Sequence, residues 1–183
     1  MLEREHVPAT FFVIGSRARG NRALLKRMLR GGSTIANHTL THANVAGAGA
    51  FAAQQIAATQ SIIHHESGFK PCLFRPPYGA SRPALSDVVR SFGALSILWD
   101  VDSNDRQRPG TATIVADVLR QTRPGSIILM HDGGRDRSQT VAALPTIIRE
   151  LRRRGLRFVT VEQLLGLRLI GAAGSRRHAA LRG

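Results

Sequence analysis

Short apolar runs alternate with longer amphipathic segments along nearly the whole chain, and this alternation limits the fold more than any other feature. The runs have the length of buried strands, while the segments between them repeat apolar residues at helical spacing. Repeated strand–helix–strand units predict an α/β fold in which helices cover a parallel sheet. The expected strands are 9–14, 33–37, 73–75, 95–100, 126–130 and 157–160. The expected helices are 21–30, 51–66, 83–92, 111–121, 140–154 and 161–167.

Length and composition are those of one globular domain. The chain has 183 residues, 43% of them hydrophobic, and is therefore long enough to bury a hydrophobic core. Cys72 is the single cysteine, so no intrachain disulfide can form. No apolar run approaches the ~18 residues of a membrane span, and none is expected. Residues 168–183 are basic and lack an apolar pattern, so we expect a disordered tail after a domain of residues 1–167.

The chain is strongly basic, with a formal net charge of +14, and such a balance is common in nucleic-acid binders. The basic residues are nearly all arginines, and they are spread from Arg4 to Arg182 rather than massed. Aromatic residues make up only 5% of the chain, so the array on which nucleic-acid bases stack is missing. We therefore expect an Arg-rich solvated surface and no nucleic-acid partner.

Residues that can do chemistry follow four of the expected strands. Ligands of parallel α/β folds bind at the carboxyl ends of the strands, so these segments are expected to meet in one site. His38 and His42 are four residues apart, which brings two imidazoles to one side of a helical turn and within reach of one metal ion. Taken alone, the pair is equally well explained as polar loop residues.

The other three segments supply an arginine, carboxylates and a third histidine. Arg75 ends a strand before two prolines, either to pair with a carboxylate or as part of a structural turn. Asp100, Asp102 and Asp105 follow the next strand, where they either face the site or cap the following helix. His131 ends an apolar strand, where an imidazole can move protons near neutral pH, although a loop histidine would look the same.

Together these segments resemble the motifs of the polysaccharide deacetylase family, whose members remove acetyl groups from N-acetylated glycans such as chitin oligomers and peptidoglycan. Segment 38–42 (His-Thr-Leu-Thr-His) resembles the metal-binding motif, and 75–79 (Arg-Pro-Pro-Tyr-Gly) resembles the third motif. Segment 102–105 (Asp-Ser-Asn-Asp) is similar to the fourth motif and 129–131 (Leu-Met-His) to the fifth. The resemblance extends over about residues 7–165 and implies a distorted, irregular β/α barrel with a parallel sheet.

The resemblance also implies roles. His38 and His42 would bind a divalent metal ion, usually zinc and sometimes cobalt or another ion, which would polarise the acetamide carbonyl and lower the pKa of a bound water. The backbone N–H of Tyr78 would help to hold the oxyanion, His131 would protonate the leaving amine, and Asp105 would support that imidazole. The residues expected to contact the N-acetylated glycan are Pro77, Tyr78 and Leu129, the last lining the acetyl pocket.

The sequence departs from the family pattern in two places. Arg106 follows Asp105 where the family usually has a Trp that walls the acetyl pocket. The family also opens with a strand ending in Thr-Phe-Asp-Asp-Gly, whose aspartates supply the catalytic base and a third metal ligand, and Arg75 would orient that base. This motif does not occur in the chain, so the first strand is expected to be missing and a sheet edge to be open.

The missing motif leaves several interpretations open. The chain as given either starts at an internal Met of a longer protein or is a degenerate relative, and Arg75, Asp105 and His131 favour the first, because each depends on the missing strand.

The leading function is metal-dependent removal of N-acetyl groups, with little activity in the chain as given. The alternatives are a deacetylase-like module that binds glycan without turnover and an Arg-rich nucleic-acid binder. The compartment is extracytoplasmic if a longer precursor carries a signal and cytoplasmic otherwise, and the oligomeric state is left open.

Overall fold

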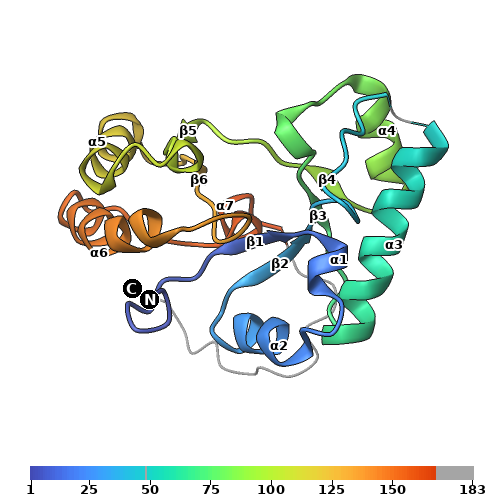
Figure 1. Ribbon diagram of the computed structural model, residues 1–183, viewed down its shortest axis with the longest axis horizontal. Coiled ribbons are helices and arrows are strands. Elements are labelled where there is room, and N and C mark those ends of the chain that lie inside the picture. The colour runs from blue at the N-terminus through green and yellow to red at the C-terminus, as the bar shows by residue number, and fades with distance from the viewer. Residues whose placement is uncertain (48, 168–183) are drawn as a thin grey trace, which may run out of the picture.

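The strands form two parallel sheets with helices around them (Figure 1). The structure is a computed structural model that describes residues 1–47 and 49–167, so the tail expected at 168–183 lies outside the described residues. The larger sheet has the order β1-β2-β3-β4, and the smaller one pairs β5 with β6. The strands are β1 (Thr10–Val13), β2 (Thr34–Asn37), β3 (Leu73–Phe74), β4 (Leu95–Ser96), β5 (Val101–Asp102) and β6 (Ile128–Leu129).

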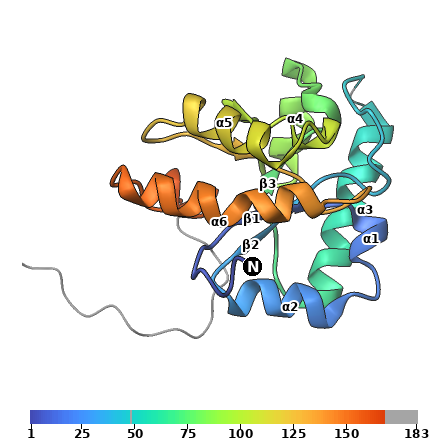
Figure 2. The ribbon, with the colours of Figure 1, turned by 60° about the vertical axis from the view of Figure 1, so that its left-hand side comes forward.

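The helices pack on the sheets in two groups, α3 with α4 on one side and α5 with α6 on the other (Figures 1 and 2). The first group shares a buried cluster with β3 that includes Ile56, Phe74 and Leu85, and the second shares one that includes Ile114 and Ile147. No helix in the described part of the chain is long and apolar enough to cross a bilayer. The helices are α1 (Gly15–Ala18), α2 (Arg22–Arg30), α3 (Gly49–Ser67), α4 (Pro83–Ser91), α5 (Thr111–Gln121), α6 (Ser138–Arg153) and α7 (Val161–Leu164), with short 3-10 turns η1 (Pro77–Gly79) and η2 (Asp105–Gln107).

The register of the larger sheet determines which residues leave it together. Asn37 of β2 pairs with Phe74 of β3, which in turn pairs with Ser96 of β4. Because the strands are parallel, the residues that follow them emerge at the same edge of the sheet. His38 and Arg75 are therefore neighbours at this edge.

The predicted α/β fold with parallel strand pairing is confirmed, and each expected helix is found within a few residues of its expected bounds. The strand expected at 95–100 ends after Ser96, because the carbonyls of Ile97 and Leu98 accept hydrogen bonds from the Arg75 side chain rather than from a neighbouring strand. The prediction of a strand at 157–160 was wrong, because these residues are not in a strand. Thr160 instead forms a capping box at the start of α7. The described strands do not close a barrel.

The last helix joins the start of the first sheet. Val161 N donates to Thr10 Oγ1 (2.9 Å), and Thr10 Oγ1 donates to Glu162 Oε2 (3.4 Å). Within the described residues β1 has a strand partner on one side only, and α7 contacts its first residue. Glu162 is 1% exposed, and its Oε1 lacks a hydrogen-bond partner there. Burial raises the pKa of Glu162, although threonine hydroxyls around it work in the opposite direction.

Candidate active site

The loop that follows β2 and carries the histidine pair is held from two sides. Oε1 of Gln55, a residue of α3, accepts hydrogen bonds from the backbone N–H groups of Leu40 (3.0 Å) and Thr41 (3.1 Å). On the other side, the carbonyl of Leu40 accepts a hydrogen bond from Ser16 N in α1 (2.9 Å). The loop backbone is thus satisfied without a strand partner, which fixes the direction of its side chains.

His38 and His42 lie edge to face, with ring centroids 4.9 Å apart and an interplanar angle of 73°. His38 Nδ1 donates to the carbonyl of Arg75 (2.6 Å), and since a carbonyl only accepts, the lone pair of the neutral ring is on Nε2. Burial lowers the pKa of His38 to about 4, so this imidazole is neutral near pH 7, the form that binds metals. The pKa of His42 is also lowered, by burial and then by the charges of His131 and Arg106.

His131 follows β6 and is paired with a buried carboxylate. Asp105 accepts hydrogen bonds from His131 Nδ1 (2.7 Å) and from His131 N (2.8 Å). A third hydrogen bond to Asp105 comes from the hydroxyl of Thr140 in α6 (2.9 Å). The side chain of Asp105 is inaccessible to solvent while that of His131 is 32% exposed, so the imidazole is anchored at Nδ1 and open at its other nitrogen.

Arg75 is buried, with 7% of its surface exposed. Its guanidinium lies over the Phe12 ring, with Cζ 4.0 Å from the centroid, and 5.5 Å from the centroid of Trp99. It donates to the carbonyls of Ile97 (3.2 Å) and Leu98 (3.1 Å). Burial lowers the pKa of Arg75 to about 10, so the side chain still carries its charge near pH 7.

The backbone around the site is strained at several residues. Thr39, His42 and Tyr78 have φ values of 67°, 62° and 63°, in the left-handed region that residues with a Cβ seldom adopt. Such conformations persist only where the surroundings impose them, and they concentrate at functional sites. Tyr78 is 62% exposed, and its ring lies 4.9 Å from that of His42. An open pocket of about 250 Å³ is lined by Tyr78, Gly79, Leu98 and Trp99.

The donor set for a metal ion is only partly present. Two imidazoles at this distance suit a divalent ion, because the lone pair of His38 Nε2 is free to bind it. A catalytic zinc site usually has three protein ligands, and the described residues contain no group of three His, Cys, Asp or Glu that would hold one. The chain therefore offers a two-histidine site.

The expected site residues form two groups, His38 with His42, Tyr78 and Arg75, and His131 with Asp105, while two acids lie elsewhere. Asp100 accepts hydrogen bonds from Ser126 Oγ (2.8 Å) and Ile127 N (2.5 Å), and Asp102 accepts one from Asn104 N (2.8 Å). Asp100 thus binds the segment that leads into β6 and Asp102 holds a local turn, so the alternative of site-facing acids holds for Asp105 alone. Pro77 is buried in η1, and Leu129 is half-buried in β6 beside Met130 and His131. Their predicted contacts with substrate stay predictions.

Sequence reasoning missed residues that position the site from distant segments. These are Gln55, which holds the histidine loop, Thr140, which binds Asp105, and Phe12, which stacks on Arg75. Each comes from a regular helix or strand, where its residue type is unremarkable. A buried Gln or Thr on an apolar helix face is the one signal that sequence offers for the first two.

The sequence matches the family model described as polysaccharide deacetylase over residues 1–96. A peptidoglycan-N-acetylglucosamine deacetylase of Bacillus cereus is 38% identical over 167 residues, covering 90% of this chain and 78% of the relative. This chain belongs to the polysaccharide deacetylase family. A chitooligosaccharide deacetylase of Sinorhizobium fredii, 36% identical over 175 residues, covers 85% of the chain and 78% of that relative. The family predicted from the four motifs is confirmed.

Solved structures of polysaccharide deacetylases include inactive members. A CE4 family pseudoenzyme from Bacillus anthracis has a TM-score of 0.83 and 30% identity to this chain. The match covers 90% of this chain but only 57% of the solved one, so the chain spans less than two thirds of that protein. A mutant of the pseudoenzyme with restored enzymatic activity has the same TM-score. The shared fold is therefore compatible with both an active and an inactive site.

Proposed function

We propose that this chain is a hydrolase of the acetamide group on N-acetylated amino sugars of a glycan such as peptidoglycan or a chitin oligomer. The observation that carries the proposal is the His131–Asp105 pair, which anchors the imidazole at Nδ1 and leaves its other nitrogen open, in a chain that also pairs His38 with His42. Amide hydrolysis needs a group that polarises the carbonyl and an acid that protonates the leaving nitrogen. The names of the relatives support the same substrate class.

In this proposal His131 transfers a proton, while the other residues position His131 and the substrate. Asp105 holds Nδ1 of His131, so Nε2 is the atom that delivers a proton to the leaving amine. The strained turn at Tyr78 directs its backbone N–H to the oxyanion. Leu129 and Pro77 would bound the acetyl group.

A divalent metal ion, zinc or cobalt, would be held by His38 and His42 and would supply Lewis-acid polarisation of the carbonyl. Since only two protein donors are available among the described residues, binding should be weak. Calorimetry is expected to show weak zinc binding that disappears in His38→Ala and persists in His64→Ala, a control on the exposed end of α3. Tight stoichiometric binding that survives His38→Ala would contradict the assignment.

The activity test measures acetate release from N-acetylglucosamine oligomers in zinc or cobalt buffer. This chain should turn over little, because a positioned base contributes roughly 10²–10⁴ in rate and the carboxylates of Asp102 and Asp105 are committed to other contacts. A variant extended at its N-terminus by a strand containing Thr-Phe-Asp-Asp-Gly is expected to gain turnover, and His131→Ala in that variant to lose most of it. Equal activity with and without the extension would mean that another carboxylate is the base.

A second candidate is a module that binds the same glycans without hydrolysing them. The two-histidine donor set and the structural likeness to a pseudoenzyme favour it. Saturable binding of N-acetylglucosamine oligomers, with no acetate release from either the chain or its extended variant, would select this function over the first.

A further inference from the structure

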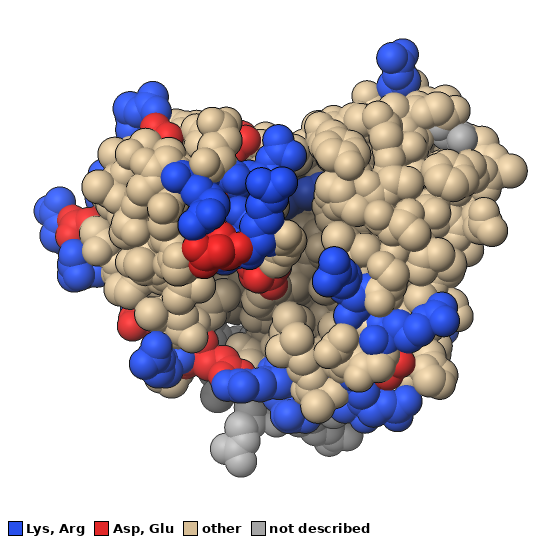
Figure 3. Space-filling view, viewed as in Figure 1, with Lys and Arg blue, Asp and Glu red and all other residues tan. Residues whose placement is uncertain are grey.

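Two loops supply the His131–Asp105 pair, and the same loops are rich in arginine. Residues 105–108 follow β5 and include η2, while residues 131–137 join β6 to α6. The four arginines of these loops, here called the arginine rim, are Arg106, Arg108, Arg135 and Arg137. The first three are exposed, and the fourth is half-buried. Lys and Arg side chains gather on this half of the molecule, with α5 and α6, at the border of a hollow (Figure 3).

The Arg137 side chain fastens the two loops to each other. Its Nε donates to the carbonyl of Gly133 (2.9 Å), and its Nη1 donates to the carbonyl of Asp105 (3.3 Å). That carbonyl belongs to the peptide that joins Asp105 to Arg106, so the guanidinium of Arg137 lies beside the start of Arg106. Its Nη2 has no acceptor in the part of the chain that the structure describes. A guanidinium that is already held in place loses little conformational freedom when it binds a ligand.

The carboxylates of the two loops do not balance the charge of the arginine rim. Asp136 pairs with Arg108 (2.7 Å), and both side chains are about half exposed. Asp105 is inaccessible to solvent and bound to His131. Asp132, the third carboxylate of these loops, is exposed. Four arginines therefore share two accessible carboxylates, and the surface beside His131 is left with an excess of positive charge.

We propose that the arginine rim selects acidic substrates, in which the N-acetylated sugar itself carries a carboxylate. The proposal rests on the proposed deacetylation and deepens it, because it separates acidic glycans from neutral ones such as chitin oligomers. A carboxylate accepts paired hydrogen bonds from a planar guanidinium, and a cationic border speeds the encounter with an anionic ligand. Arg106 and Arg137 are assigned to the carboxylate, since they meet at the peptide that follows Asp105.

N-acetylmuramic acid and N-acetylglucosamine are a matched pair of probes, because they differ only in a lactyl ether that carries a carboxylate. The methyl ester of N-acetylmuramic acid keeps the ether and removes the charge, while N-acetylglucosamine 6-phosphate carries its charge at another position of the sugar. Each probe is titrated into the metal-free, ¹⁵N-labelled chain and followed by NMR. This measurement needs no turnover, so its failure is distinct from that of the proposed deacetylation, which is tested by acetate release.

N-acetylmuramic acid is expected to bind about three- to tenfold more tightly than N-acetylglucosamine, a modest gain because the ion pairs are exposed. The preference should fall as salt is raised. The ester should bind no more tightly than N-acetylglucosamine, and the phosphate should bind less tightly than N-acetylmuramic acid. The backbone signals that shift most should be those of residues 105–108 and 131–137.

Arg106→Gln should reduce the preference for N-acetylmuramic acid to less than about twofold. Arg90→Gln, at an exposed arginine of α4, is the matched control and should keep the preference of the parent chain. Far-UV circular dichroism shows whether each variant is folded. If Arg106→Gln does not fold, Arg137→Lys decides, because it keeps the charge but loses the fork and should also lower the preference.

Three results would overturn the proposal. The first is that N-acetylmuramic acid does not bind saturably, or binds no more tightly than its methyl ester. The second is that N-acetylglucosamine 6-phosphate binds as tightly as N-acetylmuramic acid, which would show a response to charge in general. The third is that the folded Arg106→Gln or Arg137→Lys chain keeps the preference of the parent.

Discussion

Asp105 is held ionised by its three hydrogen bonds although it is buried. Burial acts to raise its pKa, but the two hydrogen bonds from His131 and the one from Thr140 outweigh burial, and the net pKa lies below the ordinary carboxyl value. A lowered pKa means that these contacts stabilise the fold above the ordinary value and are lost as the pH falls through the lowered one. Near pH 7 the carboxylate is therefore fully available to orient His131.

Replacing Thr140 by Val should expose how much of this arrangement depends on one hydroxyl. The two side chains have the same shape, but Val leaves Asp105 Oδ2 with one fewer donor in a buried place. We expect a loss of about 1–3 kcal/mol in the free energy of unfolding, measured in urea. Thr113→Val, on the exposed side of α5, should change it by less than about 0.5 kcal/mol. Equal effects at the two sites would refute a special role for Thr140.

Comparing Gly79 with Gly93 separates the cost of a left-handed backbone from the cost of a steric contact. Its φ is 66°, and a Cβ there would lie 3.0 Å from the Trp99 ring, whereas Gly93 has φ 68° and open space around it. Gly93→Ala should cost about 1–2 kcal/mol from the left-handed conformation alone, and Gly79→Ala should cost more because the indole must also move. Thermal unfolding and the tryptophan emission check this, and only Gly79→Ala is expected to change the emission.

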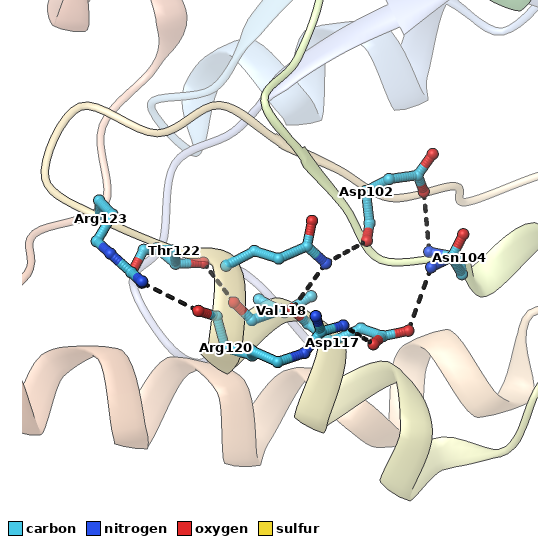
Figure 4. A network of polar contacts seen from close by, with 8 residues as sticks. Asp102, Asn104, Asp117, Val118, Arg120, Thr122 and Arg123 are labelled. Atoms are coloured by element: carbon cyan, nitrogen blue, oxygen red, sulfur yellow. Dashed lines mark hydrogen bonds and ion pairs between the residues drawn. The ribbon is translucent and has the colours of Figure 1, made fainter.

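At the scale of elements, the turn before η2 is what delivers Asp105 to His131. Asn104 adopts a left-handed conformation (φ 54°) and is held from two sides (Figure 4). Its backbone N–H donates to Asp102 Oδ1 (2.8 Å), and its Nδ2 donates to Asp117 Oδ2 in α5 (3.2 Å). The helix α5 is thereby connected to the position of the site carboxylate.

Asp117→Ala should loosen that turn. Asp117 also pairs with Arg120, as Asp87 pairs with Arg90 in α4, so Asp87→Ala is a matched control that removes a surface ion pair and nothing else. We expect a cost of about 1–2 kcal/mol for Asp117→Ala, against less than about 0.5 kcal/mol for the control. Hydrogen exchange at Ser103 to Asp105 should become faster only in Asp117→Ala. Unchanged exchange there would show that α5 does not hold the turn.

Helices with an apolar face at regular spacing were predictable from the sequence, as in α5, whose expected and observed bounds agree. Strand ends were less predictable, because a strand ends where its partners end. The Arg75 side chain donates hydrogen bonds to the carbonyls of Ile97 and Leu98, which follow β4. No local pattern in residues 95–100 indicates this interaction. The motif residues of the site could be named because they follow strands, whereas Gln55 and Thr140 reach it from helices.

For the whole molecule, Glu162 connects the last helix to the first strand at an electrostatic cost that depends on pH. Its pKa is raised by burial, so the folded state keeps a proton that the unfolded chain releases near the ordinary value. That contribution to stability is complete below the ordinary pKa and is lost as the pH rises through the raised one. The chain should thus lose stability on this account toward neutral pH.

Glu162→Gln removes the titration while keeping the size of the side chain. We expect this variant to match the parent chain in free energy of unfolding at pH about 4 and to exceed it near pH 7. Urea unfolding across this pH range is the measurement. A Glu162→Gln chain that is less stable than the parent at pH 7 would show that the carboxylate is instead favourable as an ion.

The two histidine systems belong to different sheets. His38 and His42 follow β2 of the larger sheet, while Asp105 and His131 follow β5 and β6 of the smaller one, and no strand pairing joins the two sheets in the described part of the chain. A hollow separates the half with α5 and α6 from the half with α3 and α4, with Lys and Arg side chains along its border (Figure 3). Packing rather than strand pairing therefore connects the two histidine systems, through the buried cluster in which Ile97 and Ile127 meet. A ligand that touched both histidine systems would add a second connection between the sheets.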